Sequence, residues 1–332
     1  MSIEDSQHFL IVPDAKNAAR PEVLQKESAG ILKILPADTK LLFSPVNHVY
    51  LVSSSAMDLI AAIDALPAIS FSATREKDWY VKEASRAMKE GKILYAGKYS
   101  SPDFELLLEG EAGLAIQNTM IYHKPDVMEK LSQLGIESLV EKSVNEKSPL
   151  GRLEWIKVYG LLFGKEKEAE AYFNSHLENL KPLLTSLDDE KKGPVAAFFY
   201  ITKNGEVNVR LADDYIPQMI RMAGADYFYD GKVQNIQMEE FYALAKDADI
   251  LIYNATVDLA PESKEDLLRK SPLLADFKAF KNDSLYFTSR DFFQKTTAIS
   301  RFIKDVNQIV RKNSMDGRDF SDDNLIYVRK IK

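Results

Sequence analysis

Cysteine is absent from the 332 residues, histidine occurs only four times and tryptophan only twice. Without cysteine, the sequence offers no disulfides, no thiolate metal ligands and no cysteine nucleophile. No apolar run approaches the length that spans a bilayer. The lack of cysteine fits the cytoplasm, and it fits equally a Gram-positive cell surface, where secreted proteins often have no disulfides.

Positive charge is not concentrated anywhere in the sequence. The net charge is −7, and Lys and Arg are mixed with acidic residues, as in "REKDWYVKE". We therefore expect no nucleic-acid partner. The start, "MSIEDSQHFLIVPD", lacks a basic segment followed by an apolar run, so either the protein is cytoplasmic or an export signal has been removed.

Catalytic motifs are also missing. "GKILYAGKY" resembles a phosphate-binding loop, but five residues separate its glycines instead of four, and Tyr99 stands where Ser or Thr would bind magnesium. The sequence contains no dinucleotide fingerprint, no G-x-S-x-G and no H-E-x-x-H. We therefore predict that the protein is not an enzyme and carries no cofactor; the competing class is a two-lobed α/β enzyme such as a nucleotide-sugar transferase.

Short apolar strands and amphipathic helices alternate in residues 1–150. The strand segments are "HFLIVPD", "KLLF", "HVYLV", "AISFSAT", "ILYAG", "GLAIQNT" and "GIESLVE", and residues 14–38 are expected to form a loop with a weak helix. Ser53–Ser55 are placed as the N-cap of a helix that runs to Leu66, and Gly91 is placed at the end of another. This alternation predicts a mostly parallel sheet with helices on both faces.

The pattern changes at Pro149. "PLGRLEWIKVYGLLFGKEKEAEAYFNSHLENLKPLLTSL" has helical spacing throughout, with Gly164 as punctuation, and predicts one or two long helices without a strand. Strand and helix then alternate again to the end, where "NLIYVRK" reads as an edge strand. The predicted fold is α/β, with two Rossmann-like lobes of mostly parallel sheets, a long linker helix and a ligand cleft between the lobes.

We place the boundaries at 1–150 for the N-terminal lobe, 151–188 for the linker and 189–332 for the C-terminal lobe. It stays open whether the last helix and strand pack back toward the first lobe. "GLAIQNT" and "ILIYNAT" each end a buried strand on polar residues, and ligands of parallel α/β sheets bind beyond such strand ends. Asn118 is therefore a candidate ligand contact, although an Asn in this position also begins loops by bonding to nearby backbone.

Several segments, taken in order, resemble the helix-bridged (class III) substrate-binding proteins of ABC importers for iron–siderophore, haem and corrinoid ligands. They are "GKYSSPDFELLLEGEAGLAI", "SPLGRLEWIKVYGLLFGKEKEAEAYF", "LADDYIPQMIRMAGADYFYD" and "SPLLADFKAFKNDSLYFT". The family's opening Ser-Pro-Ser-Ala-Thr-Glu appears only in a stretched form, "FSPVNHVYLVSSSAMDL". The strand "HFLIVPD" is additional, and we expect it to extend or flank the first sheet.

The resemblance implies a monomeric, extracellular solute-binding protein that delivers an iron complex of siderophore type to an ABC permease dimer. Haem and corrinoids are the alternative ligands for the same scaffold. The implied location is a membrane-anchored lipoprotein of a Gram-positive cell, whose signal and anchor cysteine are missing from this sequence. One Glu per lobe is implied to contact the permease; Glu105 and Glu239 match by position, and Glu240 is adjacent to the second.

Anionic, flat ligands suit Arg and aromatic residues, which offer charge-assisted hydrogen bonds and stacking. On this basis the candidate ligand contacts beside Asn118 are Tyr99, Tyr122, His123, Arg152, Trp155, Arg210, Tyr253, Arg290 and Phe292. For any one Arg the alternative is a surface ion pair, and for Trp155 it is core packing. We predict no metal site: among His8, His48, His123 and His176, only His48 and His123 suggest a pair, and no further ligands accompany them.

Overall fold

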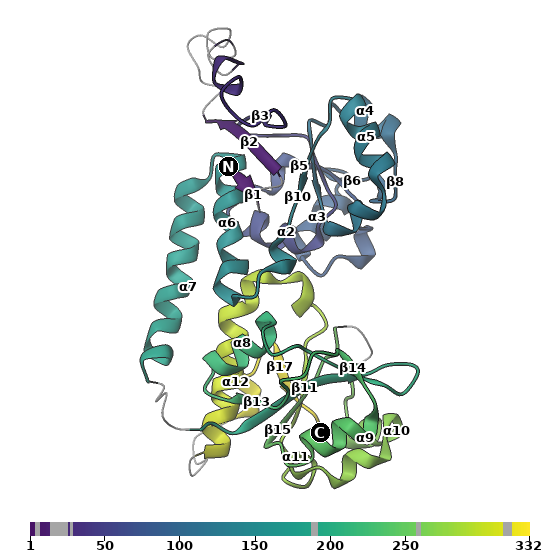
Figure 1. The fold of residues 1–332 in the computed structure, drawn as a ribbon, viewed down its shortest axis with the longest axis vertical. Helices are drawn as coiled ribbons and strands as arrows, with labels where there is room; N and C mark the ends of the chain where they lie inside the picture. Colours follow the sequence, from purple (N-terminus) through teal and green to yellow (C-terminus); the bar gives the residue numbers. More distant parts are fainter. Residues whose placement is uncertain (4–6, 14–25, 27–28, 187–191, 257–259, 315–320) are drawn as a thin grey trace. The chain divides into compact units, whose positions relative to one another are not determined.

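The structure is a computed structural model that describes residues 1–3, 7–13, 26, 29–186, 192–256, 260–314 and 321–332 (Figure 1). The chain divides into two compact units. Unit 1 contains residues 1–145 and 153–175, and unit 2 contains residues 146–152 and 176–332. In the described part of the chain, no helix is both long and apolar enough to cross a membrane.

Unit 1 is built on a five-stranded sheet with the order β10-β9-β4-β5-β6, in which every neighbouring pair is parallel. Its strands are β4 (Val49–Leu51), β5 (Ile69–Ser72), β6 (Leu94–Tyr95), β9 (Leu114–Gln117) and β10 (Glu137–Val140). Its helices are α2 (Ser54–Ala62), α3 (Lys82–Lys89), α4 (Phe104–Glu109) and α5 (Pro125–Gln133). The alternation predicted from the sequence is confirmed for this unit.

A second, three-stranded sheet flanks the first. It contains β1 (Ser2–Ile3), β2 (Gln7–Val12) and β3 (Lys40–Phe43), with β2 and β3 parallel. Side chains attach it to the edge strand β10: Gln7 Nε2 donates to Val140 O (3.0 Å), Val140 N donates to Gln7 Oε1 (2.7 Å), and Lys40 Nζ donates to Ser138 O. The additional strand therefore flanks the sheet. Most of the loop expected at 14–38 lies outside the described residues.

The helical segment after unit 1's sheet consists of two helices, α6 (Pro149–Phe163) and α7 (Glu166–Ser186). They separate at Gly164, as the sequence predicted, and Gly164 has a φ of +64°, which glycine adopts without strain. A Cβ on Gly160 would lie 2.7 Å from the Cβ of Ala169, so this glycine lets α6 and α7 approach closely. The start of α6 belongs to unit 2, and α7 passes from unit 1 to unit 2 after Ser175.

Unit 2 has a seven-stranded sheet with the order β14-β12-β11-β15-β16-β17, and β13 also pairs with β11. The strands are β11 (Val195–Ile201), β12 (Val207–Val209), β13 (Asp226–Tyr227), β14 (Asn235–Ile236), β15 (Ile250–Tyr253), β16 (Leu285–Thr288) and β17 (Val328–Lys330). The centre is parallel, and three pairs are antiparallel: β12 with β11, β14 with β12, and β17 with β16. The short turn from β11 to β12 allows only an antiparallel pair, and "NLIYVRK" supplies the predicted edge strand.

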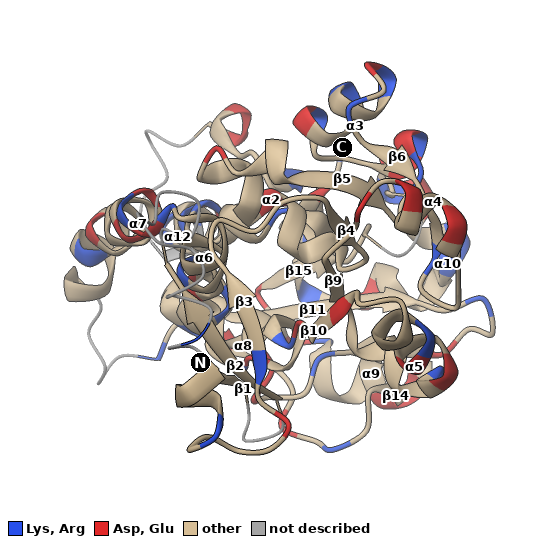
Figure 2. Ribbon diagram, turned by 90° about the horizontal axis from the view of Figure 1, so that it is seen from above, with Lys and Arg blue, Asp and Glu red and all other residues tan. Residues whose placement is uncertain are grey.

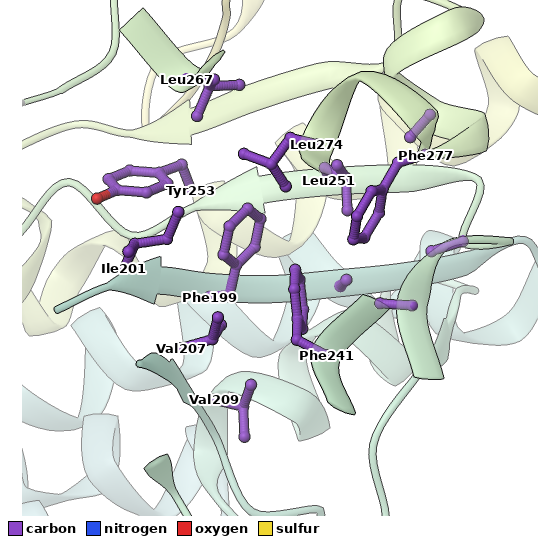
Figure 3. Close-up of a cluster of buried hydrophobic side chains, with 14 of the residues drawn as sticks. Phe199, Ile201, Val207, Val209, Phe241, Leu251, Tyr253, Leu267, Leu274 and Phe277 are labelled. Carbon is purple, nitrogen blue, oxygen red and sulfur yellow. The ribbon is translucent and has the colours of Figure 1, made fainter. Parts of the chain in front are cut away.

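Aromatic residues dominate one face of the unit 2 sheet (Figure 3). The Phe199 ring lies 4.6 Å from that of Phe241 and 5.6 Å from that of Tyr253, and Phe277 packs against Phe241. The helices of this unit are α8 (Tyr215–Met222), α9 (Met238–Ala245), α10 (Lys264–Lys270), α11 (Lys278–Lys281) and α12 (Ile299–Ser314). The last helix, α12, packs against α8 and β17 of the same unit.

Candidate functional site

The topology of unit 1 selects one end of its sheet as the candidate site. From β4 the chain first adds β5 and β6 on one side, and later adds β9 and β10 on the other. The connections therefore diverge between β4 and β9, which makes this pair the topological switch point. In open parallel sheets, ligands bind at the carboxyl ends of the strands at such a point.

A hollow of about 320 Å³ lies at these carboxyl ends, and we call it the strand-end hollow. Residues on or after β4, β5, β6 and β9 form its wall. The lining residues are Val52 and Ser54 after β4, Ala73, Thr74, Arg75 and Asp78 after β5, Tyr95, Lys98 and Tyr99 on and after β6, and Asn118 after β9. Two predicted contacts, Tyr99 and Asn118, are therefore brought together here.

The loop after β5 is held in place by a buried serine. Ser72 Oγ donates to Thr74 O (2.8 Å) and accepts from Thr74 N (3.0 Å) and from Trp79 Nε1 (3.2 Å). This network fixes the turn that carries Arg75, whose guanidinium lies 5.2 Å from the centre of the Tyr95 ring. The guanidinium is thereby oriented by a cation–π contact at the wall of the hollow.

The loop after β6 depends on Gly97, which has a φ of +82°. A Cβ at this position would lie 2.4 Å from Ser101 O, so only glycine fits the tight turn between β7 (Gly97–Lys98) and β8 (Ser101–Pro102). Tyr50 Oη donates to Gly97 O (3.0 Å) and anchors the turn to the core. Lys98 and Tyr99 are thus presented to the hollow by a rigid loop.

A buried carboxylate fixes the start of α2 beside the hollow. Glu141, which follows β10 and is fully buried, accepts hydrogen bonds from Ser53 Oγ (2.8 Å), Ser55 Oγ (3.2 Å) and Ser143 N (2.7 Å). The N-cap predicted within Ser53–Ser55 is confirmed at Ser53, but without a side-chain capping bond, because the Ser53 hydroxyl is bonded to Glu141. Ser54, between them, lines the hollow.

The two Asn residues that follow β9 and β15 make the same local turn. Asn118 Oδ1 accepts from Met120 N (3.0 Å), and Asn254 Oδ1 accepts from Thr256 N (3.2 Å) and Thr256 Oγ1 (2.6 Å). Each carbonyl oxygen is therefore used to begin the loop, which is the alternative left open for such residues. Asn118 also lines the strand-end hollow.

In unit 2, two predicted arginines meet the first residues of α8. The Arg152 guanidinium lies 4.0 Å from the centre of the Tyr215 ring, and Arg210 Nη1 lies 3.4 Å from Asp214 Oδ2. Asp214 caps α8 by accepting from Ile216 N. The structure thus gathers Arg152 and Arg210 at residues 214–215, which we call the α8 arginine pair.

The backbone of Arg210 is held by Tyr227. The phenol of Tyr227 accepts from Arg210 N (3.1 Å) and donates to Arg210 O (3.0 Å). Burial raises the pKa of Tyr227 above its usual value, so the hydroxyl keeps the proton that it donates. The side-chain Nε of Arg210 is buried and has no hydrogen-bond partner among the described residues.

Residues 49–291 match the sequence profile of the periplasmic binding protein family. The chain belongs to this family. The match begins at β4, so the flanking sheet β1–β3 precedes it.

An uncharacterised lipoprotein of Methanocaldococcus jannaschii is 26% identical over 302 residues, covering 84% of this chain and 68% of the relative. A periplasmic haem-binding protein from Pseudomonas aeruginosa has a TM-score of 0.64 at 14% identity, covering 86% of this chain and 97% of that one. The catecholate-siderophore binding protein VctP from Vibrio cholerae has a TM-score of 0.60 at 14% identity, covering 78% and 92%. These similarities confirm the α/β fold predicted from the resemblance to class III ABC-importer substrate-binding proteins.

Two other predicted contacts are core residues in this family member. Tyr253 is 1% exposed within the aromatic core of unit 2 (Figure 3), and Phe292 is 5% exposed and stacks on Phe302 at 4.7 Å. Both side chains pack in the core of unit 2, and a ligand contact by either stays a prediction. Trp155 is also largely buried, in α6, which agrees with the core-packing alternative.

Three further candidates are exposed. Tyr122 and His123 lie on the short helix η4 (Thr119–His123), where the Tyr122 ring is 6.0 Å from Lys142 Nζ, and Arg290 follows β16. They lie outside the residues that line the strand-end hollow. His48 precedes β4 whereas His123 follows β9, so the two histidines lie at opposite ends of a parallel sheet. Within the described residues, no group of three or more His, Asp or Glu is placed to hold a metal ion.

Arg75 and Lys98, the two cations that line the hollow, were not among the predicted contacts. Both directly follow strands that it identified, "AISFSAT" and "ILYAG". The rule that selected Asn118, a polar residue after a buried strand, would have found both. Their signal is weak because "TREKD" is typical of a solvated charged loop, whereas "GKY" belongs to a segment that resembles an imperfect phosphate-binding loop.

The two predicted docking glutamates occupy equivalent positions in their helices. Glu105 is the second residue of α4 after the N-cap Asp103, and Glu239 is the second residue of α9 after the N-cap Gln237. The fourth residue of each helix is buried in its unit's core. This equivalence favours Glu239 over Glu240 as the counterpart of Glu105, and all three side chains are exposed.

Proposed function

We propose that this protein is the extracellular solute-binding component of an ABC importer, and that it captures an anionic iron complex of siderophore type for delivery to a permease. The observation that carries the proposal is the strand-end hollow. It combines the cations Arg75 and Lys98 with the aromatic rings of Tyr95 and Tyr99 at a topological switch point. Anionic catecholates and flat chelates are ligands that such groups bind by charge-assisted contacts and stacking.

The α8 arginine pair of unit 2 supports the same ligand class. The guanidinium of Arg152 is stacked on Tyr215, and guanidinium groups bind carboxylate and catecholate oxygens by charge-assisted hydrogen bonds. We propose Arg152 and Arg210 as a second anion-contacting surface of this chain. Charges elsewhere are interspersed in sign, as along α7 (Figure 2), so these cations are a local feature rather than part of a basic face.

A ligand panel tests the proposed substrate. The purified protein is titrated with a ferric tris-catecholate siderophore, a ferric hydroxamate siderophore, haem and cobalamin, with native mass spectrometry and tryptophan fluorescence as readouts. Trp79 is a suitable reporter because its indole N–H bonds to Ser72, which shapes the wall of the hollow. We expect tight one-to-one binding of an anionic iron complex.

Variants of the hollow sharpen this test. Arg75→Ala and Lys98→Ala are each expected to weaken binding of the anionic complex about tenfold, since a charge-assisted hydrogen bond contributes roughly 1.5–3 kcal/mol. Lys92→Ala is the matched control: this exposed lysine of the same unit pairs with Glu90 outside the hollow. Binding only of neutral or cationic compounds, or turnover of an activated sugar, would contradict the proposal.

We further propose that Glu105 and Glu239 contact the permease. The double variant Glu105→Ala with Glu239→Ala is expected to keep its ligand affinity and to lose uptake in cells that express the cognate permease. Glu109→Ala with Glu240→Ala is the control, because these exposed glutamates lie on the same two helices. Normal uptake by the first double variant would refute the assignment.

We propose that the mature protein is a monomer held at the outer face of a Gram-positive membrane by a lipid anchor. The names of the M. jannaschii relatives as lipoproteins support an anchored form. Fractionation of cells that express the full gene tests this, with the protein expected in the membrane fraction and released by detergent but not by salt.

A further inference from the structure

Gln117, the last residue of β9, is a buried polar side chain without a partner. It is 0% exposed, and neither its Nε2 nor its Oε1 has a hydrogen-bond partner among the residues that the structure describes. Its backbone is ordinary sheet, with Gln117 O accepting from Glu141 N (2.9 Å). A buried amide with both polar atoms unpaired is costly, and such groups in native proteins usually await water, an ion or a ligand.

The sheet register places this amide behind the wall of the strand-end hollow. Tyr50 pairs with Ala115 and Leu51 with Ile116, so the next residues, Val52 and Gln117, lie side by side on adjacent strands. Side chains at paired positions of parallel strands project from the same face. Val52, which lies beside Gln117 on this face, lines the hollow. Gln117 therefore lies at the switch point, beside a residue that forms the wall of the hollow.

The same unit contains a glutamine with the opposite situation. Gln7, on the flanking strand β2, uses both amide atoms: Nε2 donates to Val140 O at 3.0 Å and Oε1 accepts from Val140 N at 2.7 Å. Gln117 is the register partner of that same Val140 within the main sheet. Gln7 and Gln117 thus lie on either side of Val140, and of the two only Gln7 has hydrogen-bond partners for its side-chain amide among the described residues.

We propose that Gln117 is a specificity-determining residue of the strand-end hollow, whose amide is completed by an uncharged polar group of the bound solute, directly or through one water. This inference rests on the proposed function and adds to it a second recognition element. An amide offers one acceptor and a donor pair, so it suits a group that both donates and accepts, such as a carboxamide, a hydroxyl or an uncharged backbone amide of a siderophore. Arg75 and Lys98, in contrast, recognise negative charge.

The amide is closed from solvent in the ligand-free structure, so contact requires a side-chain rotation of Gln117 or an intervening water. Haem, whose polar groups are carboxylates, offers no uncharged donor–acceptor group to this amide. We therefore expect Gln117 to favour amide-containing siderophores over haem.

The test compares Gln117→Met with Gln7→Met, since methionine keeps the length of the side chain and removes the amide. In the ligand-free protein, Gln117→Met is expected to raise the melting temperature by about 2–4 °C because it removes unpaired buried groups, and Gln7→Met to lower it because it breaks two hydrogen bonds. Gln117→Leu serves as a second variant if the methionine packs poorly.

Affinity for the same probes gives the second readout. Gln117→Met is expected to weaken a ferric tris-catecholate with amide-linked arms, or a ferric hydroxamate, about tenfold, while haem affinity changes less than twofold. Gln7→Met should leave every affinity within twofold. Unchanged siderophore affinity in Gln117→Met would overturn the inference, as the amide would then hold an internal water only.

The experiments distinguish a failure of the proposed function from a failure of the inference about Gln117. If no probe binds the wild-type protein, the proposed ligand class is wrong, and the thermal shift alone decides the inference. A raised melting temperature in Gln117→Met then supports an amide reserved for a partner outside the chain. A lowered one shows that the protein satisfies this amide itself, and overturns the inference.

Discussion

The strands β9 in unit 1 and β15 in unit 2 are followed by the same Asn turn, but the side chains that precede this turn have different environments. After β9 and after β15, an Asn accepts a hydrogen bond from the backbone N–H two residues on. The residue before that Asn differs: Gln117 in unit 1 has an unpaired amide, whereas Tyr253 in unit 2 packs its ring against Phe199. The same turn therefore terminates a strand beside a hollow in one unit and above a filled aromatic core in the other.

This difference shows what makes a strand end available to a ligand. In unit 2, Thr288 Oγ1 of the neighbouring strand accepts from Ala255 N, and Tyr253 fills the space below. In unit 1, the equivalent space is lined by cations and aromatic side chains and stays open. Polar residues after a strand by themselves indicate only a turn. They indicate a ligand-binding site when a hollow lies next to them.

The largest contrast is expected between the two tyrosines. Tyr253→Ala removes a fully buried ring and leaves a cavity, so the free energy of unfolding should fall by about 3–5 kcal/mol. Tyr99→Ala, at the half-buried wall of the hollow, should lower it by no more than about 1 kcal/mol and instead weaken ligand binding. Denaturant unfolding and ligand titration measure both. A stable Tyr253→Ala protein with impaired binding would reverse the two assignments.

A smaller contrast is expected between the two asparagines. Asn254 is 2% exposed and its Oδ1 accepts two hydrogen bonds from Thr256, so Asn254→Ala leaves two donors of the half-buried Thr256 unpaired and should cost about 1–3 kcal/mol of stability. Asn118 is half-buried and accepts one bond, so Asn118→Ala should cost about 1 kcal/mol. Equal losses of unfolding free energy in the two variants would show that burial does not separate the turns.

The smallest contrast is a pH effect confined to unit 2. His176 lies 2.6 Å from Ser300 Oγ, and burial, with the charge of Lys304, lowers the pKa of His176 below its usual 6.5. Because the folded state holds this proton less tightly than the unfolded state, the contribution of neutral His176 is complete above pH 6.5 and is lost as the pH falls toward the lowered pKa.

The measurement is the difference in unfolding free energy between pH 7.5 and pH 5.5 for the wild-type protein and for His176→Gln. The variant should lose less stability on acidification, since it has no group to titrate at this position. A control, His123→Gln, changes an exposed histidine of unit 1 and should behave as the wild-type protein does. Identical pH dependence of all three proteins would show that His176 is not linked to folding.

Local patterns predicted most of the elements. Period-two and helical spacing located the strands of unit 1, the break at Gly164 and the edge strand β17, because these depend on neighbouring residues. The same patterns failed for side chains with distant partners. Ser53 has the identity and position of an N-cap, but its hydroxyl is taken by Glu141, which follows a different strand. The two-residue strands β13 and β14 were too short to give any periodicity.

The sequence predicted which types of residue form the candidate site, but it identified only some of the residues themselves. The strand-end rule found Asn118 and Tyr99, and the Arg-with-aromatic rule found Arg152 and Arg210, which the structure gathers around α8. The same rules also selected Tyr253 and Phe292, which are buried. Whether a side chain near the end of a strand is exposed or buried depends on the residues that pack against it. Arg75 and Lys98 carried the same signal as Asn118 and were hidden within charged segments.

The sequence by itself determined the alternation of strands and helices, the positions of the turns and the family, since each follows from local residue chemistry or from the order of segments along the chain. Only the tertiary structure decided that the ring of Tyr253 fills one strand end while the amide of Gln117 is left without a partner at the other. The physical reason is that burial and hydrogen-bond satisfaction depend on side chains from strands and helices far away in sequence, which meet only when the sheet is assembled.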